Sequence, residues 1–66
     1  MSLSRDEMGK ISVFAYNMGV KYMQKNTAYI EEQLSNILYE GINDERWIKA
    51  MNLFMKNFKE GIMQEL

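Results

Sequence analysis

The side chains with potential for acid–base chemistry in this sequence are almost all carboxylates. The chain has nine Asp and Glu residues but no His and no Cys. Glu31-Glu32 and Asp44-Glu45 are pairs of adjacent residues, so in a helix the members of each pair point in different directions. Both pairs lie near expected helix N-termini, where the helix dipole favours negative charge. We therefore interpret them as helix-stabilising groups and expect no catalytic residues.

The sequence lacks the His and Cys residues from which most metal sites and activated nucleophiles are built. A chain without His and Cys cannot build a zinc site of the usual kind, nor the Glu-x-x-His pattern of a di-iron bundle. Its Ser residues have no His to activate them as nucleophiles. We therefore expect no metal, no cofactor and no enzymatic activity.

The charge balance does not favour binding to nucleic acid. Eight Lys and Arg residues against nine Asp and Glu residues give a net charge of −1, whereas phosphate binding normally requires a clear positive surplus. Basic residues gather on the predicted outer side of the last helix, but acidic residues lie among them. The basic residues are Arg46, Lys49, Lys56 and Lys59, and the acidic ones are Asp44, Glu45 and Glu60. A small transcription regulator, or the dimerisation region of one, is the alternative function that we retain.

Capping residues predict the first two helices. Ser4 and Glu7 fit the S-x-x-E capping box, in which the side chain of each accepts a hydrogen bond from the backbone N–H of the other. Asn26 can end a helix, and Thr27 can cap the next one. One bent helix over residues 5–40 is the alternative at this point.

The third helix follows a stronger break. Gly41 can close the preceding helix and Asn43 can cap the following one, while Ile42 is placed to pack on Trp47 as a hydrophobic staple. Gly61 offers a further stop. These signals predict an all-α fold, a three-helix antiparallel bundle with the first helix central. The predicted helices span residues 5–25, 27–40 and 44–60.

The first predicted helix has more apolar surface than the other two can cover. In the second and third helices the apolar residues form one stripe, whereas in the first they occupy nearly the whole circumference, and such a helix is normally buried on more than one side. We expect the bundle to be completed by homodimerisation or by a partner helix. The predicted interface residues are Phe14, Tyr16, Met18, Val20, Tyr22 and Met23.

The charges are segregated between the first two helices. Residues 5–25 contain four basic and two acidic residues, and residues 27–40 contain three acidic residues and no basic one. Because opposite charges steer the pairing of surfaces, this asymmetry favours the two helices as neighbours, either within one subunit or across a two-fold axis.

Methionine and aromatic residues are the most unusual part of the composition. The chain has seven Met, four Tyr, three Phe and one Trp. Flexible thioethers beside aromatic rings suit an irregular core or an oligomer interface, which is the interpretation that we favour. A groove for a partner protein and a pocket for an apolar ligand are the alternatives.

The start of the sequence and its lack of targeting patterns bear on domain organisation and location. Met1-Ser2-Leu3 is typical of an expression-vector leader, so we expect one helical domain over residues 4–66, either complete or cut from a longer protein. We find no signal-peptide pattern and no apolar run of membrane-spanning length. We therefore expect a cytoplasmic location without membrane binding.

Taken together, these features of the sequence predict a non-catalytic helical module for protein interaction or oligomerisation.

Overall fold

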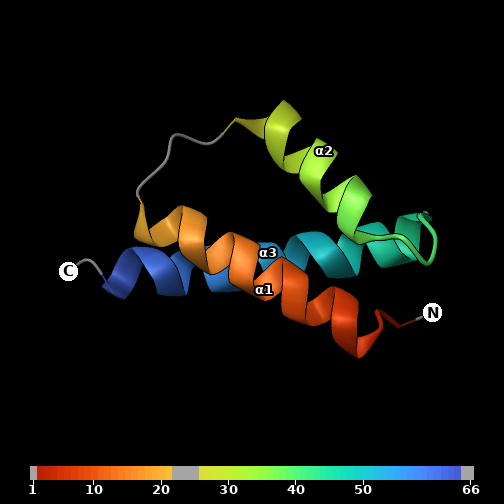
Figure 1. The fold of residues 1–66 in the computed structure, drawn as a ribbon, viewed down its shortest axis with the longest axis horizontal. Coiled ribbons are helices and arrows are strands. Elements are labelled where there is room, and N and C mark those ends of the chain that lie inside the picture. The colour runs from red at the N-terminus through yellow and green to blue at the C-terminus, as the bar shows by residue number, and fades with distance from the viewer. Residues whose placement is uncertain (1, 22–25, 65–66) are drawn as a thin grey trace.

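The computed structural model describes residues 2–21 and 26–64 of the chain. Its helices are α1 (Arg5–Val20), α2 (Thr27–Ile37) and α3 (Asp44–Gln64). Helices α1 and α3 run in the same direction side by side, and α2 runs back in the opposite direction (Figure 1). The predicted all-α three-helix bundle is thereby confirmed. The packing is uneven, because α1 contacts α3 extensively and α2 only slightly.

The start of α1 agrees with the sequence, and its end does not. The capping box is present, since the Glu7 N–H donates to Ser4 Oγ at 3.1 Å and the Ser4 N–H donates to Glu7 Oε1 at 2.9 Å. The helix ends at Val20, however, and not at residue 25 as predicted. Gly19 and Val20 are weak helix formers in its last turn, which favours an earlier end. Residues 22–25 lie outside the described residues.

Helix α2 is separate from α1 and shorter than predicted. Its N-cap is Asn26, whose Oδ1 accepts from the Tyr29 N–H at 3.1 Å, so Thr27 is the first helical residue and not the cap. The helix ends at Ile37 instead of residue 40. The chain then reverses through a loop in which Gly41 has a φ of 131°, a conformation that favours glycine.

Helix α3 begins where predicted and continues past its predicted end. Asn43 caps it, because its Oδ1 accepts from the Arg46 N–H at 2.9 Å. Gly61 does not stop the helix, which extends to Gln64. The expected stop at residue 60 was therefore wrong, and the reason for a glycine at position 61 is its packing against α1.

Gly19 and Gly61 allow the backbones of α1 and α3 to cross at very short range. A Cβ atom added to Gly19 would overlap the carbonyl oxygen of Phe58 and lie 2.9 Å from the Ile62 nitrogen. A Cβ atom added to Gly61 would overlap the carbonyl oxygen of Tyr16 in the same way. These are backbone atoms, so a larger residue at either position would push the two helices apart.

The hydrophobic core lies between the three helices and centres on Phe54. This ring is fully buried and contacts the rings of Phe14 and Phe58, with centroid distances of 5.7 Å in both cases. Leu3, in the segment that resembles a leader, is also buried in this core. The buried apolar residues are Leu3, Ile11, Ala15, Met18, Ile30, Leu34, Leu38, Ala50 and Phe54.

Two glycines of α1 should respond to alanine in opposite ways. Gly19→Ala should lower the free energy of unfolding by about 2 kcal/mol or more, because the added methyl group separates α1 from α3. Gly9→Ala should raise it by about 0.5–1 kcal/mol, because nothing lies within 4 Å of the added Cβ. Urea denaturation followed by circular dichroism measures both changes. Equal effects at the two positions would contradict the close crossing.

Candidate functional site

An ion pair with both side chains buried joins the first turns of α1 and α3. Glu7 and Arg46 are 0% and 3% exposed, and Arg46 Nη2 donates a hydrogen bond to Glu7 Oε2. The sequence pattern placed Arg46 on the outer, solvated side of the third helix, and this placement was wrong. The missed signal is its spacing, because Arg46 lies four residues before Ala50 and eight before Phe54, in the same buried row of α3.

The ion pair is surrounded by further hydrogen bonds that connect three segments. Arg46 Nε donates to the Gly41 carbonyl at 2.7 Å, and Arg46 Nη1 donates to the Ser2 carbonyl at 2.8 Å. Glu7 Oε2 also accepts from the Glu40 N–H at 3.2 Å. Among the described residues, no buried side-chain nitrogen or oxygen lacks a hydrogen-bond partner. The hydrogen bonds of the buried pair are thus all made within the fold, and they tie the N-terminal segment and the α2–α3 loop to the two helices.

Hydrogen bonding determines the ionisation of Glu7. Burial by itself would raise the pKa of this carboxyl group, because it penalises the charged form. The hydrogen bonds from Arg46, Ser4 and Glu40 outweigh that penalty and lower the pKa to about 2 from its ordinary value of 4.5. Glu7 is therefore ionised at neutral pH and unsuited to act as a general acid or base there.

An exposed polar cluster on the same side holds the α2–α3 loop against α1. The Tyr39 hydroxyl donates to Asp6 Oδ2 at 2.9 Å, and Lys10 Nζ lies 3.2 Å from the same oxygen. Lys10 Nζ is also 5.3 Å from the centroid of the Tyr39 ring. The hydrogen bond from Tyr39, followed by that from Lys10, lowers the pKa of Asp6, and the bond to Asp6 raises the pKa of Tyr39. Because these groups are exposed, each contact contributes little to stability.

The described residues offer no sign of a metal site or a membrane span. Within residues 2–21 and 26–64, no group of three or more His, Cys, Asp and Glu residues lies close enough to hold a metal ion. In the same part of the chain, no helix combines the length and the apolar character needed to cross a membrane.

The outer side of α3 carries less positive charge than the sequence pattern predicted. Lys49, Lys56 and Lys59 are exposed, but Arg46 is turned into the core. Lys49 Nζ lies 3.2 Å from Glu45 Oε1, which offsets part of the remaining charge. The observation therefore gives no support to direct DNA binding by this face, and the regulator alternative stays a prediction.

The six predicted interface residues have different surroundings. Met18 is buried in the core of the subunit itself, and the Phe14 ring packs between Phe54 and Tyr29. Tyr16 and Val20 are half-buried. Tyr22 and Met23 lie outside the described residues. The structure thus places Met18 in the core of its own subunit, and the role of the other residues in an interface stays a prediction.

Val13 lies on the side of α1 that α2 and α3 leave uncovered, which is called the open side below. It was not among the predicted interface residues. It is 62% exposed, and Tyr29 on α2 is 44% exposed. The signal for Val13 was present in the sequence, since it adds to the apolar circumference of the first helix. Removing the exposed Val13 and the half-buried Phe14 from water would be energetically favourable, because both side chains are apolar.

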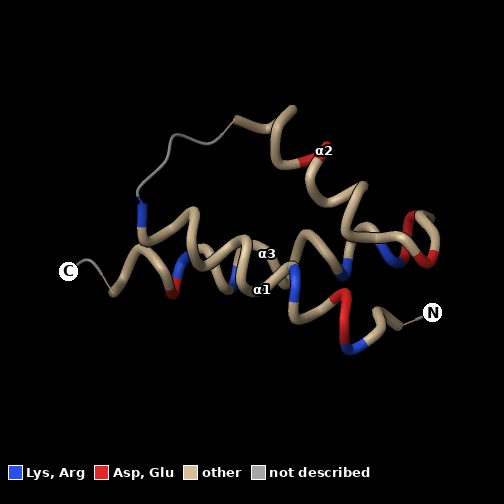
Figure 2. The backbone as a smooth tube through the Cα atoms, viewed as in Figure 1, with Lys and Arg blue, Asp and Glu red and all other residues tan. Residues whose placement is uncertain are grey.

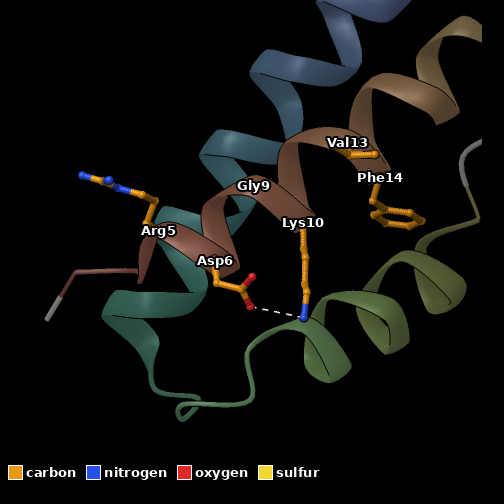
Figure 3. Close-up of a pocket in the computed structure, with 6 residues that line it drawn as sticks. All are labelled: Arg5, Asp6, Gly9, Lys10, Val13 and Phe14. Carbon is orange, nitrogen blue, oxygen red and sulfur yellow. Dashed lines mark ion pairs between the residues drawn. The ribbon is translucent and has the colours of Figure 1, made fainter.

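A hollow of about 820 Å³ runs along this side of α1. It is lined by Arg5, Asp6, Gly9, Lys10, Val13 and Phe14 and is called the α1 hollow below. Asp6, Lys10 and Phe14 point towards α2, and Arg5 points away from it (Figure 3). Gly9 lies in one row with Arg5 and Val13, at a spacing of four residues, and a Cβ atom added to it would meet nothing within 4 Å.

A second, smaller hollow of about 460 Å³ lies where the N-terminal segment meets α1 and α3. Apolar groups from Leu3, Met8 and Leu53 line it, together with Lys49 and Lys56. The hydrogen bond from Arg46 to the Ser2 carbonyl holds the segment that forms its wall. The charged groups that line the α1 hollow are Arg5 and the ion-paired Asp6 and Lys10, and those that line the smaller hollow are Lys49 and Lys56.

Acid should destabilise the fold through Glu7. A carboxyl group whose pKa is lowered by folding contributes stability above pH 4.5, and that contribution is lost as the pH falls towards 2. The free energy of unfolding should therefore drop over this range by a few kcal/mol, on the order expected for a paired buried carboxylate. Urea denaturation at a series of pH values measures the slope.

The Glu7→Gln variant provides the control for the acid effect. It should be less stable at neutral pH, because Arg46 is left buried without a counter-charge, and its pH dependence below 4.5 should be shallower. If this variant does not fold, the double variant Glu7→Leu/Arg46→Leu removes both charges together. An unchanged acid slope in either variant would contradict the assignment to Glu7.

Compared with models of protein families, with curated proteins and with solved structures, the chain gives no match.

Proposed function

We propose that this chain is a non-catalytic helical module whose role is protein association, beginning with association with a second copy of itself. The carrying observation is the open side of α1, where Val13 is 62% exposed beside the half-buried ring of Phe14. This surface remains after α1 has packed on α3 and α2.

The uneven packing of the bundle supports this proposal. Helix α1 directs Ile11, Ala15 and Met18 into the core, and its contact with α2 is small. One side of the central helix is therefore left with few neighbours. Apolar side chains left partly uncovered on such a side, here Val13 and Phe14, give a second molecule a surface to cover.

The size of the chain supports association for a second reason. A domain of 66 residues buries a smaller share of its surface than a larger one, so its stability is marginal. Small domains add stability through disulfides, metals or oligomerisation. This chain has no Cys and no His, so disulfides and the commonest metal ligands are not open to it.

Sedimentation velocity from low micromolar to near-millimolar concentration tests the proposal. The chain should shift from monomer to dimer, and Val13→Glu should weaken the dimer about tenfold or more by placing a charge on the buried surface. The fold of the monomer should not change, because Val13 is largely exposed within it.

The matched control is Ile48→Glu on α3, where the residue is 58% exposed in the monomer. It introduces the same charge on a different helix and should leave the dimer intact. A wild-type chain that remains monomeric throughout the concentration range would contradict the proposed function.

A further inference from the structure

We infer that the α1 hollow is occupied by the outer face of α2 from a second copy of the chain, with each copy contributing both surfaces about a two-fold axis. The inference rests on the proposed self-association and adds the identity of the two contacting surfaces. Four features of the structure support it: the charge of the hollow, the charge of α2, the shape of both surfaces, and their occurrence on one chain.

The α1 hollow carries an uncompensated positive charge. Asp6 is engaged by Lys10 at 3.2 Å and by the Tyr39 hydroxyl at 2.9 Å. Arg5 forms no ion pair with any described carboxylate and extends away from α2 into solvent (Figure 3). A ligand for this hollow should therefore bring carboxylates to the side on which Arg5 lies.

The outer face of α2 supplies carboxylates without any basic residue. This face consists of Ala28, Glu31, Glu32 and Ser35, all of which are exposed. Figure 2 shows acidic but no basic positions along α2. No described Lys or Arg forms an ion pair with Glu31 or Glu32. The two surfaces are thus complementary in charge, which favours their pairing and fixes its register.

The shapes of the two surfaces allow close approach. Gly9 leaves space in α1, since nothing lies within 4 Å of a Cβ atom added there. Ala28 and Ser35 are small and lie seven residues apart, so they fall on one line along α2. A helix with small residues on this line can settle over Gly9 while its glutamates reach the rim of the hollow.

The opposite face of α2 is already occupied, which leaves the outer face for a partner. Ile30 and Leu34 are buried in the core of their own subunit, and Leu38 follows them there. Helix α2 can therefore pack on its own subunit with one side and on a second copy with the other.

A two-fold arrangement doubles the area of the contact. Helix α2 has 11 residues, so it is about 16 Å long, and one such crossing is small beside the roughly 800 Å² per partner of a stable interface. Because each chain carries both the α1 hollow and the acidic face of α2, a two-fold arrangement forms the contact twice. The smaller hollow is a weaker candidate, since Glu45 already pairs with Lys49 at its rim.

Charge exchange tests the inference. Arg5→Glu should weaken the dimer about tenfold, because each two-fold contact loses an attractive pair and gains a repulsive one. Glu31→Lys/Glu32→Lys should weaken it to a similar extent. The triple variant, which carries all three changes, should recover dimerisation to within about threefold of wild type, since complementary charges face each other again. Sedimentation velocity at low salt measures the dimer dissociation constants.

Two controls separate a local effect from a general one. Lys59→Glu and Glu60→Lys make the same charge changes on exposed positions of α3 and should leave the dimer unchanged. A third variant tests the hollow itself: Gly9→Trp places a large side chain where an added Cβ atom meets nothing within 4 Å, and it should abolish dimerisation. Circular dichroism should show that its helicity is retained.

The outcomes distinguish the inference from the proposed function. A dimer in which the triple variant shows no recovery, or in which Gly9→Trp dimerises normally, would overturn this pairing of surfaces and leave self-association standing. A wild-type chain that never dimerises would overturn both, and a protein other than a second copy would then be the occupant to seek.

Discussion

The buried ion pair between Glu7 and Arg46 is the constraint on which the rest of the structure depends. Removing two charges from water is unfavourable, and their mutual attraction offsets this only when the remaining donors and acceptors are satisfied. Here the Ser2 and Gly41 carbonyls and the Glu40 N–H complete the set. The demand for these partners brings the N-terminal segment and the α2–α3 loop to the start of α1, and it fixes which residues of α1 and α3 face each other.

The Gly19–Gly61 crossing is the second fixed point, towards the other end of the same pair of helices. The ion pair specifies the register of α1 and α3, and the glycines allow their backbones to approach closely. Together they commit one face of α1 to α3. Helix α2 has no comparable attachment, since its contact with α1 is small. The open side of α1 therefore lies where neither α3 nor α2 covers this helix.

Features that depend on residues close together in the chain could be predicted from the sequence, whereas features that depend on distant residues could not. The caps at Ser4 and Asn43 could be predicted because the groups involved are three residues apart. The roles of Arg46 and Gly61 could not, because each depends on a partner more than 35 residues away: Arg46 pairs with Glu7, and Gly61 packs on Gly19. An arginine otherwise belongs on the surface, and a glycine near a helix end otherwise indicates a stop.

The open side of α1 also gives association a thermodynamic consequence. A partner that binds only the folded state stabilises it by an amount that grows with partner concentration. For a chain with a marginal core, this links folding to the amount of protein present.

The acidic face of α2 is well suited to such a contact, because Glu31 and Glu32 are exposed and make no ion pair with a described residue of their own subunit. Their carboxylates are solvated in the monomer, so an ion pair at the rim of an interface, where water still reaches it, requires little desolvation. Charge would then select the register of the dimer, and the apolar groups around Val13 would supply most of its affinity.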